Sequence, residues 1–192
     1  MNTIPSRPAL FLDRDGVINV DYGYVHKVRD FVFVPGIFAL CTRAMAAGYR
    51  LVVVTNQAGI ARGYYTESQF VELMDWMRQE FLLRSIQLDG VYFSPYHPLH
   101  GLGAYRVDSP CRKPRPGMLH QASADLGIDL SRSMLIGDNY TDIQAGAAAG
   151  LSRLILLQPE GLNCGPPASP QNLPIHQRVH SLDEITFCPV GA

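Results

Sequence analysis

The sequence of 192 residues has few cysteines, no long apolar run and almost no net charge, and each absence excludes a class of protein. Its four cysteines are dispersed without a Cys-x-x-Cys pair, which argues against a disulfide framework and favours a reducing compartment. The longest aliphatic runs, such as residues 51–54, are far shorter than the roughly 20 residues of a membrane span. Residues 1–8 lack the basic and apolar regions of a signal peptide. We therefore expect a cytoplasmic protein that does not associate with membranes.

Acidic and basic residues nearly balance, since 16 Lys and Arg stand against 17 Asp and Glu. Residues 106–115 are locally basic, but no aromatic binding motif accompanies them, so we expect a small anionic substrate and no nucleic acid. Hydrophobic residues make up 47% of the chain, which is enough for a folded core. The length predicts one domain over residues 1–192, with a core at about 8–158 and a proline-rich tail at about 159–192. No surface pattern demands a dimer, so we expect a monomer.

Short apolar runs alternate with segments of helical periodicity. Strands are predicted at 9–12, 51–55, 91–93, 134–136 and 154–157, and helices at 35–48, 66–81, 116–127 and 142–150, with a last helical turn at 181–184. Parallel strands need crossover helices, so this alternation predicts a three-layer, doubly wound, mainly parallel α/β fold of Rossmann-like type. Residues 94–116 and 159–174 are rich in proline and are predicted to be loops.

Two carboxylates follow the first predicted strand, in the order Asp13-x-Asp15-Gly16. In such sheets the ligand site lies beyond the carboxyl ends of the strands. One carboxylate can attack phosphorus, while a second can protonate the leaving alcohol and later activate water. Gly16 allows a turn that brings backbone N–H groups near phosphoryl oxygens. An isolated motif of this kind is more often a polar turn or a helix cap, so the other strand ends decide between these interpretations.

Further polar residues follow the other predicted strands. Thr55 offers a hydroxyl and a backbone N–H to a phosphoryl oxygen, and Lys113 offers a mobile positive charge. Asp138 adds a third carboxylate. Converging carboxylates repel one another and a phosphate unless a hard divalent cation is bound, and Mg²⁺ prefers oxygen ligands. Asp142 is expected to support a metal ligand or to cap the helix that follows.

This order of motifs resembles the haloacid-dehalogenase-like (HAD-like) superfamily of phosphotransferases. The resemblance implies that Asp13 is the nucleophile and Asp15 the acid/base, and that Thr55 and Lys113 hold the phosphoryl group. It also implies an Mg²⁺ site made by Asp13, Asp138 and the backbone carbonyl of Asp15. A dehalogenase expels halide and needs no proton donor, so Asp15 favours a phosphoric monoester hydrolase. The intervals 13–55 and 55–113 are filled by predicted elements, which leaves no room for a large cap domain.

Four loop segments, 11–25, 31–36, 55–63 and 112–118, are similar to those of the histidinol-phosphatase-type subgroup, and within it to heptose bisphosphate phosphatases. The substrate contacts implied by this resemblance are Asp21, Tyr22, Gly23, Tyr24, Thr55, Asn56, Gln57, Ala58, Arg112 and Lys113. The planar guanidinium of Arg112 suits a sugar hydroxyl or a phosphate that is not being hydrolysed. Without the resemblance, Asp21 and Tyr24 also fit an ordinary loop ordered by turn bonds.

The resemblance fails at one place. Members of the family usually bind zinc before the lysine, through a Cys-x-His pair and a later Cys-x-Cys pair. The matching positions here read Ser94, Tyr96, Ser109 and Cys111. Hydroxyl groups are poor zinc donors, so we predict that the loop folds without zinc, held by prolines and by packing of Tyr96 and Tyr105. A substitute zinc site from His97, His100 and Cys111 is the less favoured alternative.

The implied reaction is removal of the 7-phosphate from D-glycero-D-manno-heptose 1,7-bisphosphate through an aspartyl-phosphate. Its implied setting is nucleotide-activated heptose synthesis for bacterial lipopolysaccharide. Histidinol phosphate is the alternative substrate on the same scaffold, although the loop 19–24 favours the sugar. A non-catalytic phosphate-binding protein is less favoured, because every chemical position is retained. A phosphomutase is disfavoured, because no cap would keep water from the intermediate.

Overall fold

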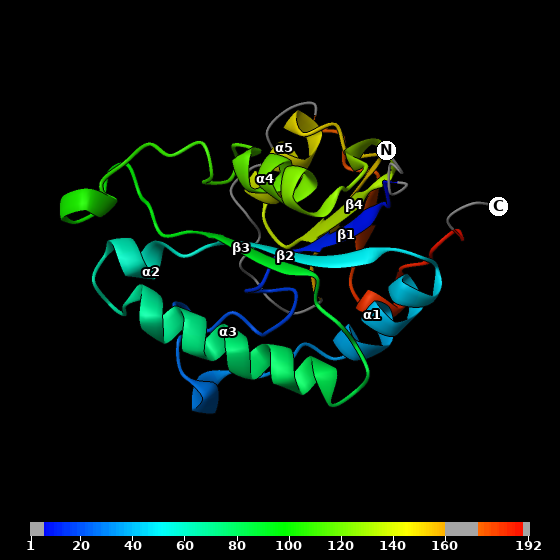
Figure 1. Cartoon of the computed structure of the whole chain (residues 1–192), viewed down its shortest axis with the longest axis horizontal. Helices are drawn as coiled ribbons and strands as arrows, with labels where there is room; N and C mark the ends of the chain where they lie inside the picture. The colour runs from blue at the N-terminus through cyan, green and yellow to red at the C-terminus, as the bar shows by residue number, and fades with distance from the viewer. Residues whose placement is uncertain (1–5, 160–172, 190–192) are drawn as a thin grey trace, which may run out of the picture.

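A six-stranded sheet forms the centre of this computed structural model, which describes residues 6–159 and 173–189. The strands are β1 (Ala9–Leu12), β2 (Arg50–Asn56), β3 (Gly90–Ser94), β4 (Met134–Gly137), β5 (Arg153–Leu157) and β6 (Gln177–Val179). They are all parallel and lie in the order β3-β2-β1-β4-β5-β6 (Figure 1). The chain therefore winds outward from β1 in one direction and from β4 in the other. The crevice of a doubly wound sheet opens between these two central strands.

Helices cover both faces of the sheet (Figure 1). They are α1 (Ile37–Ala46), α2 (Ala58–Ala61), α3 (Glu67–Leu82), α4 (Gly117–Leu126) and α5 (Tyr140–Ala148). Short 3₁₀ turns lie at Val28–Asp30, Gly103–Tyr105, Leu130–Arg132 and Leu182–Glu184. α1 and α3 lie on one face, and α4 and α5 on the other. The predicted three-layer α/β fold is confirmed. Among the described helices, none combines the length and the apolarity needed to cross a bilayer.

β1 shows why this sheet is covered on both faces. Side chains alternate along a strand, so Leu10 and Leu12 join the core beneath α1 and α3, while Ala9 and Phe11 join the core beneath α4 and α5. All four residues are fully buried. Truncating such a residue, for example Phe11→Ala, costs about 3–5 kcal/mol of unfolding free energy. The short central strand is thus a rigid support for the residues that follow it.

Several element boundaries agree with the sequence. Thr66 and Gln69 form the predicted capping box of α3, and Ser181 with Glu184 caps the last turn. α1 begins at Ile37, two residues later than predicted, because Gly36 is the N-cap in the left-handed conformation. α5 begins two residues earlier than predicted, because Asn139 caps it. Within the described residues, the segments 13–55 and 55–113 hold α1, α2, α3 and strands of the central sheet with their connecting loops, in agreement with the absence of a large cap domain.

Two elements were not predicted from the sequence, namely α2 and β6. α2 is a single turn of four residues, and β6 has three residues, so neither is long enough to show a period. β6 pairs with β5, and Leu182 and Ile185 beyond it are buried. Part of the predicted tail at 159–192 therefore belongs to the core. Most of its proline-rich stretch, residues 160–172, lies outside the described residues.

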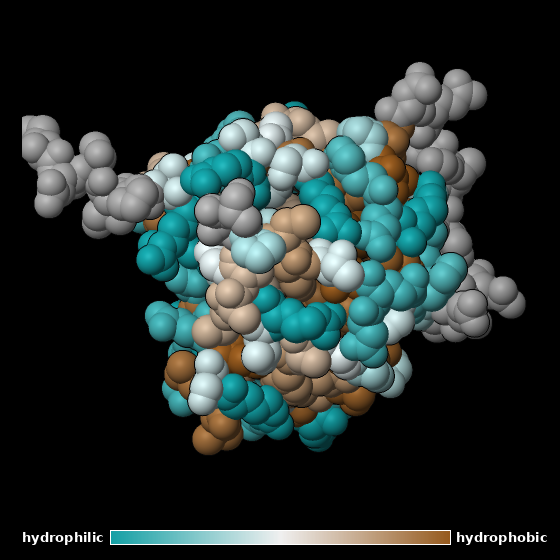
Figure 2. Space-filling model, turned by 90° about the vertical axis from the view of Figure 1, so that its right-hand side faces the viewer, coloured by the Kyte–Doolittle hydropathy of each residue, from teal (hydrophilic) through white to brown (hydrophobic). Residues whose placement is uncertain are grey.

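The two ends of the sheet differ in their surroundings. The loops that follow β1, β2 and β4 gather at one end, next to α2 (Figure 1). At the opposite end, near α1, hydrophilic and hydrophobic residues intermingle on the surface (Figure 2). The polar residues that the sequence places after the strands therefore share one end of the molecule.

Candidate active site

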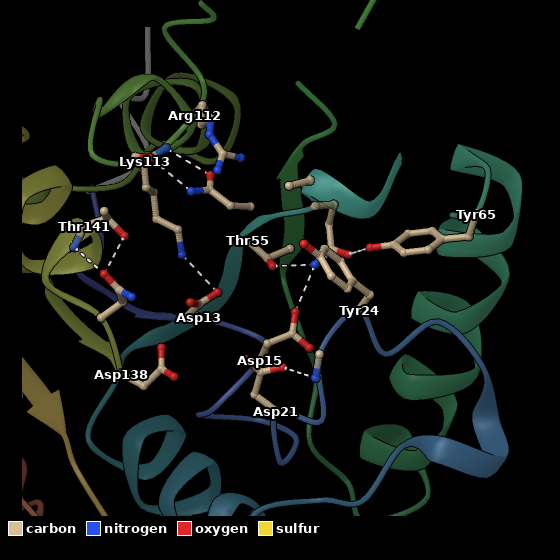
Figure 3. Close-up of a pocket in the computed structure, with 15 residues that line it drawn as sticks. Asp13, Asp15, Asp21, Tyr24, Thr55, Tyr65, Arg112, Lys113, Asp138 and Thr141 are labelled. Atoms are coloured by element: carbon tan, nitrogen blue, oxygen red, sulfur yellow. Dashed lines mark hydrogen bonds and ion pairs between the residues drawn. The ribbon is translucent and has the colours of Figure 1, made fainter. Parts of the chain in front are cut away.

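A cavity of about 560 Å³ lies at the carboxyl ends of the central strands (Figure 3). It is lined by Asp13, Asp15, Asp21, Gly23, Tyr24, Thr55, Asn56, Gln57, Ala58, Tyr65, Arg112, Lys113, Asp138, Asn139 and Thr141. Every residue predicted to bind substrate, metal or the phosphoryl group lines this cavity, except Tyr22. The tertiary structure thus brings together strand-end residues that are more than one hundred positions apart in the sequence.

Tyr22 lies outside this cavity. Its side chain is 66% exposed and lines a separate hollow beside Arg29. Asp21 Oδ1 accepts a hydrogen bond from the Gly23 N–H at 2.8 Å, so this segment has the turn bond of an ordinary loop. The same loop still presents Asp21, Gly23 and Tyr24 to the cavity.

Lys113 joins the first and fourth strand ends through its ammonium group. Its Nζ lies 2.9 Å from Asp13 Oδ1 and 2.5 Å from Asp142 Oδ1, and it donates to the Val54 carbonyl at 2.9 Å. One contact is a hydrogen bond to a backbone carbonyl, and the other two are ion pairs. Lys113 is 3% exposed, and the two carboxylates raise its pKa despite the cost of burial. It therefore stays charged and holds Asp13 in a fixed position.

Gly16 allows Asp138 to approach the DxDG turn. It has a φ of +81°, and a Cβ atom there would lie 2.0 Å from Asp138 Oδ2. A side chain would therefore be strained in its backbone and would also collide with the carboxylate. The glycine of the motif is required for the close packing of the two acidic segments.

The acidic residues carry more negative charge than the single ammonium group neutralises. Oxygens of Asp13, Asp138 and Asp142 lie within 4.8 Å of one another. Burial, followed by the charge of Asp142, raises the pKa of Asp13 to about 7, and burial, followed by the charge of Asp13, raises the pKa of Asp138 to about 8. Asp142 also caps α5 by accepting from the Asn139 N–H at 3.1 Å. The close, under-neutralised oxygens of Asp13 and Asp138 fit a hard divalent cation.

A hydrogen-bonded chain connects the ends of β1 and β2. Gln57 Nε2 donates to Asp15 Oδ2 at 3.1 Å and to Thr55 Oγ1 at 2.8 Å. The Tyr65 hydroxyl donates to Gln57 Oε1 at 2.6 Å, which fixes the orientation of the amide (Figure 3). Gln57 is 1% exposed and lines the cavity, and its amide also orients Asp15 and Thr55. The predicted contact of Gln57 with substrate stays a prediction.

Asn56 has a similar supporting role. Its amide donates to the Lys113 carbonyl at 3.0 Å and accepts from the Lys113 N–H at 3.0 Å. Arg112, next to Lys113, is half-buried, and its Nη1 donates to the Tyr96 carbonyl at 3.1 Å. Burial and the neighbouring Arg62 lower the pKa of Arg112. The positive charges of Arg112 and Arg62 therefore lie near one another, on the side of the cavity that Arg112 lines.

Sequence and structure comparisons agree with this geometry. A family model described as HAD-hydrolase-like matches residues 110–160. A D-glycero-alpha-D-manno-heptose-1,7-bisphosphate 7-phosphatase of Burkholderia mallei is 54% identical over 149 residues, which are 78% of this chain and 79% of that relative. A D-glycero-beta-D-manno-heptose-1,7-bisphosphate 7-phosphatase of Vibrio cholerae is 46% identical over 153 residues, which are 80% and 82% of the two chains. The chain belongs to this heptose bisphosphate phosphatase family.

Two solved structures of this family share the fold. The D,D-heptose 1,7-bisphosphate phosphatase of B. bronchiseptica, in complex with magnesium and phosphate, is 27% identical with a TM-score of 0.75, and the match covers 91% of this chain and 93% of that chain. The enzyme of Burkholderia thailandensis is 29% identical with a TM-score of 0.61, and covers 92% and 94%. The expected HAD-type architecture is confirmed.

The loop that is predicted to fold without zinc carries Ser94, Tyr96, Ser109 and Cys111 at the positions in question. Ser94 is fully buried, and its Oγ has no hydrogen-bond partner among the described residues. Tyr96 packs against Tyr105, with ring centroids 6.2 Å apart, as predicted. The alternative zinc ligands His97, His100 and Cys111 do not form a ligand cluster in the described part of the chain. The absence of zinc stays a prediction.

Three residues that line the cavity, Tyr65, Asn139 and Thr141, were given no role from the sequence. Arg14, which is fully buried and lies between Asp13 and Asp15 in the sequence, was given none either. Thr141 lies within the GDxxxD motif and donates to Asn139 Oδ1, so its proximity to Asp138 was a usable signal. Tyr65 stands in no motif, and only the packing of α3 brings it to Gln57.

Proposed function

We propose that this protein removes the 7-phosphate of D-glycero-D-manno-heptose 1,7-bisphosphate. The observation that carries the proposal is one cavity lined both by the reactive centre, Asp13 with Lys113, and by the basic residue Arg112. A substrate with two phosphates uses both features. The names of the 54% and 46% identical relatives support the choice of heptose.

Asp13, Asp138 and the backbone carbonyl of Asp15 would hold Mg²⁺ in this proposal. The raised pKa values of Asp13 and Asp138 support it, because burial and neighbouring carboxylates both disfavour the charged forms, which a bound cation would stabilise. When bound, the ion supplies positive charge that offsets the carboxylates and the phosphoryl oxygens. The B. bronchiseptica enzyme, whose structure was solved in complex with magnesium and phosphate, supports the same choice.

Asp13, Asp15, Thr55 and Lys113 each have a separate role in the proposed reaction. An oxygen of Asp13 attacks phosphorus while the bond to the sugar oxygen breaks, and Asp15 gives that oxygen a proton. The product is an aspartyl-phosphate and the free sugar hydroxyl. Asp15 then accepts a proton from the water that attacks the same phosphorus, which releases phosphate and restores Asp13. Lys113 and Thr55 hold the phosphoryl oxygens throughout.

The second phosphate of the substrate is assigned to Arg112. A guanidinium group binds a phosphate through two parallel hydrogen bonds, which a hydroxyl cannot match in strength. Arg62 adds a second positive charge close to Arg112, as its effect on the Arg112 pKa indicates. We therefore expect a bisphosphate to be preferred over a monophosphate of the same sugar.

A phosphate-release assay tests this proposal. The panel holds both anomers of the heptose bisphosphate, a hexose bisphosphate, heptose 7-phosphate and histidinol phosphate, each with and without Mg²⁺. We expect the highest kcat/KM on a heptose bisphosphate, and no turnover without the metal. A preference for histidinol phosphate contradicts the proposed substrate, and absence of turnover on every phosphate ester favours a non-catalytic binding protein.

The cellular compartment, the pathway, the absence of zinc and the oligomeric state are also proposals. We place the reaction in the cytoplasm, in nucleotide-activated heptose synthesis for lipopolysaccharide, and expect a zinc-free monomer. The dispersed cysteines and the heptose named for the relatives support this placement. Elemental analysis of untagged protein tests the absence of zinc, and sedimentation equilibrium tests the monomer.

A further inference from the structure

Arg14 stands between the two reactive carboxylates and has no role in the chemistry described above. Its side chain is fully buried, and it is the largest side chain in the described core with this degree of burial. A guanidinium group loses its hydration when it is buried, so it is retained only where strong partners replace the water. The partners of Arg14 therefore indicate what it does.

The main partner of Arg14 is the carboxylate of Asp15. Arg14 Nη2 donates to Asp15 Oδ1 at 2.6 Å, and Arg14 Nε donates to Asp15 Oδ2 at 3.1 Å. This bidentate pair fixes both the position and the rotation of the carboxylate. Asp15 Oδ1 also accepts from Asn19 Nδ2 at 3.1 Å, and Oδ2 from Gln57 Nε2 at 3.1 Å. Four donors thus hold the group that transfers the proton.

A further bond ties Arg14 to the substrate loop. Arg14 Nη2 donates to the Val25 carbonyl at 2.7 Å, and Val25 directly follows the loop that presents Asp21, Gly23 and Tyr24 to the cavity. The proton donor and this loop are therefore linked through one side chain. A shift of the loop changes the position of the guanidinium, and with it the position of the Asp15 carboxylate.

The remaining donor of Arg14 argues against a purely structural role. Nη1 is buried and has no hydrogen-bond partner among the described residues. An unpaired buried donor costs stability, so a residue kept for stability alone is poorly matched to this place. Phe70 is the apolar neighbour over which the guanidinium lies, with its carbon 5.7 Å from the ring centroid.

We infer that Arg14 is a positioning residue, which holds the Asp15 carboxyl in register with the substrate loop for transfer of the proton to the leaving oxygen. This inference rests on the proposed role of Asp15. Arg14 itself contacts no phosphoryl group and transfers no proton. Its loss should therefore slow reactions whose leaving group needs that proton, and should spare reactions whose leaving group does not.

Leaving groups of different basicity separate these cases. p-Nitrophenolate leaves without protonation, phenolate needs more help, and a sugar alkoxide leaves only with a proton. Single-turnover measurements with enzyme in excess report the first chemical step, so slow hydrolysis of the aspartyl-phosphate does not mask the effect. Product release from p-nitrophenyl phosphate, phenyl phosphate and the sugar bisphosphate is followed with Mg²⁺ present.

Two variants of Arg14 are compared with two references. Arg14→Lys keeps the charge but loses the bidentate fork, and Arg14→Met removes both. Asp15→Asn shows the full effect of losing the proton donor. Arg50→Met is the matched control, because Arg50 pairs with Asp89 at 2.8 Å on another part of the molecule. Circular dichroism and thermal melting establish that each variant is folded, and Arg14→Lys carries the test if Arg14→Met does not fold.

We expect the Arg14 variants to lose about 10²- to 10⁴-fold on the sugar bisphosphate, the range typical of general acid catalysis, and less than about threefold on p-nitrophenyl phosphate. The loss on phenyl phosphate should lie between these two losses. Arg50→Met should have the wild-type rate on all three substrates. An equal loss on all three substrates in folded Arg14 variants overturns the inference, as does no loss on any.

The proposed function fails in a distinguishable way. If the wild type hydrolyses the aryl phosphates but not the sugar, the choice of substrate is wrong, and the two aryl phosphates still test Arg14. If Asp15→Asn shows no dependence on the leaving group, Asp15 is not the proton donor, and both proposals are contradicted.

Discussion

The imbalance of charge around Asp13 and Asp138 makes the affinity for Mg²⁺ depend strongly on pH. In the folded protein without metal, the pKa of Asp13 is about 7 and that of Asp138 about 8. At pH 7 the Asp138 carboxyl is therefore mostly protonated and that of Asp13 about half protonated, and Mg²⁺ must displace these protons. If the two groups are treated as independent, binding releases about two protons at pH 6 and about one at pH 7.5. The affinity then rises on the order of 100- to 1,000-fold between pH 6 and pH 8.

The same shifts affect stability, and the sign follows from their direction. The pKa of each group is raised above the ordinary value of 3.8 that applies in the unfolded chain. The folded protein thus binds these protons more tightly, and this contribution to stability is fully present below about pH 4 and lost as the pH rises through 7 and 8. The carboxyl pair therefore makes the metal-free protein less stable at pH 8 than at pH 6, and Mg²⁺ should raise the Tm more at pH 8.

Isothermal titration calorimetry measures the affinity for Mg²⁺ and the number of protons released on binding. Titrations with Mg²⁺ at pH 6, 7 and 8, each in two buffers of different ionisation enthalpy, give the affinity and the number of protons released. Asp138→Asn should remove one proton from that number at pH 7 and lower the affinity, whereas the exposed Asp183→Asn should change neither. An affinity that changes less than about threefold between pH 6 and 8, or binding without proton release, would refute the reasoning.

Three further predictions concern single residues. Asp13→Asn should lower kcat by about 10⁴-fold or more while the protein stays folded, because an amide of the same size cannot attack phosphorus. If the variant keeps a normal Tm and still hydrolyses the substrate, with contamination by wild-type enzyme excluded, the nucleophile is misassigned. Gly16→Ala should lower the unfolding free energy by about 1–3 kcal/mol and weaken Mg²⁺ binding, because the added Cβ would collide with Asp138. Chemical denaturation measures the first effect and calorimetry the second. Wild-type values in both measurements contradict the prediction. Arg112→Ala should raise KM for the bisphosphate at least about 10- to 100-fold, because it removes the charge-assisted hydrogen bonds of the guanidinium group, with little change for the monophosphate. Steady-state kinetics on both substrates check it, and an equal change on both argues against a phosphate contact.

Most of the sheet, and most of the residues that line the cavity, could be predicted from local patterns. Apolar runs of strand length, the Thr66 capping box and the alternation of strand and helix each depend on residues close together in the sequence. The topology of the sheet then brings the polar residues together, because residues that directly follow parallel strands meet at one end of a sheet. The sequence for this reason predicts that Asp13, Thr55 and Asp138 share one site, and in the structure they line one cavity.

The supporting residues depended on packing between distant segments. Gln57 is oriented toward Asp15 by Tyr65, which precedes α3 and donates a hydrogen bond to the Gln57 amide oxygen. Asn56 holds the backbone of Lys113 across 57 positions. No spacing in the sequence encodes these contacts, and short elements such as β6 show no period that would reveal them.

The sequence by itself determined the kind of chemistry, because side-chain type and position after a strand are local properties. Only the tertiary structure decided how that chemistry is controlled. Whether Arg14 faces solvent or Asp15, and whether Asp142 neutralises Lys113 or binds elsewhere, depends on burial and on partners that lie far away in the chain. Electrostatic interactions strengthen when water is excluded, and water is excluded only after the helices have packed onto the sheet.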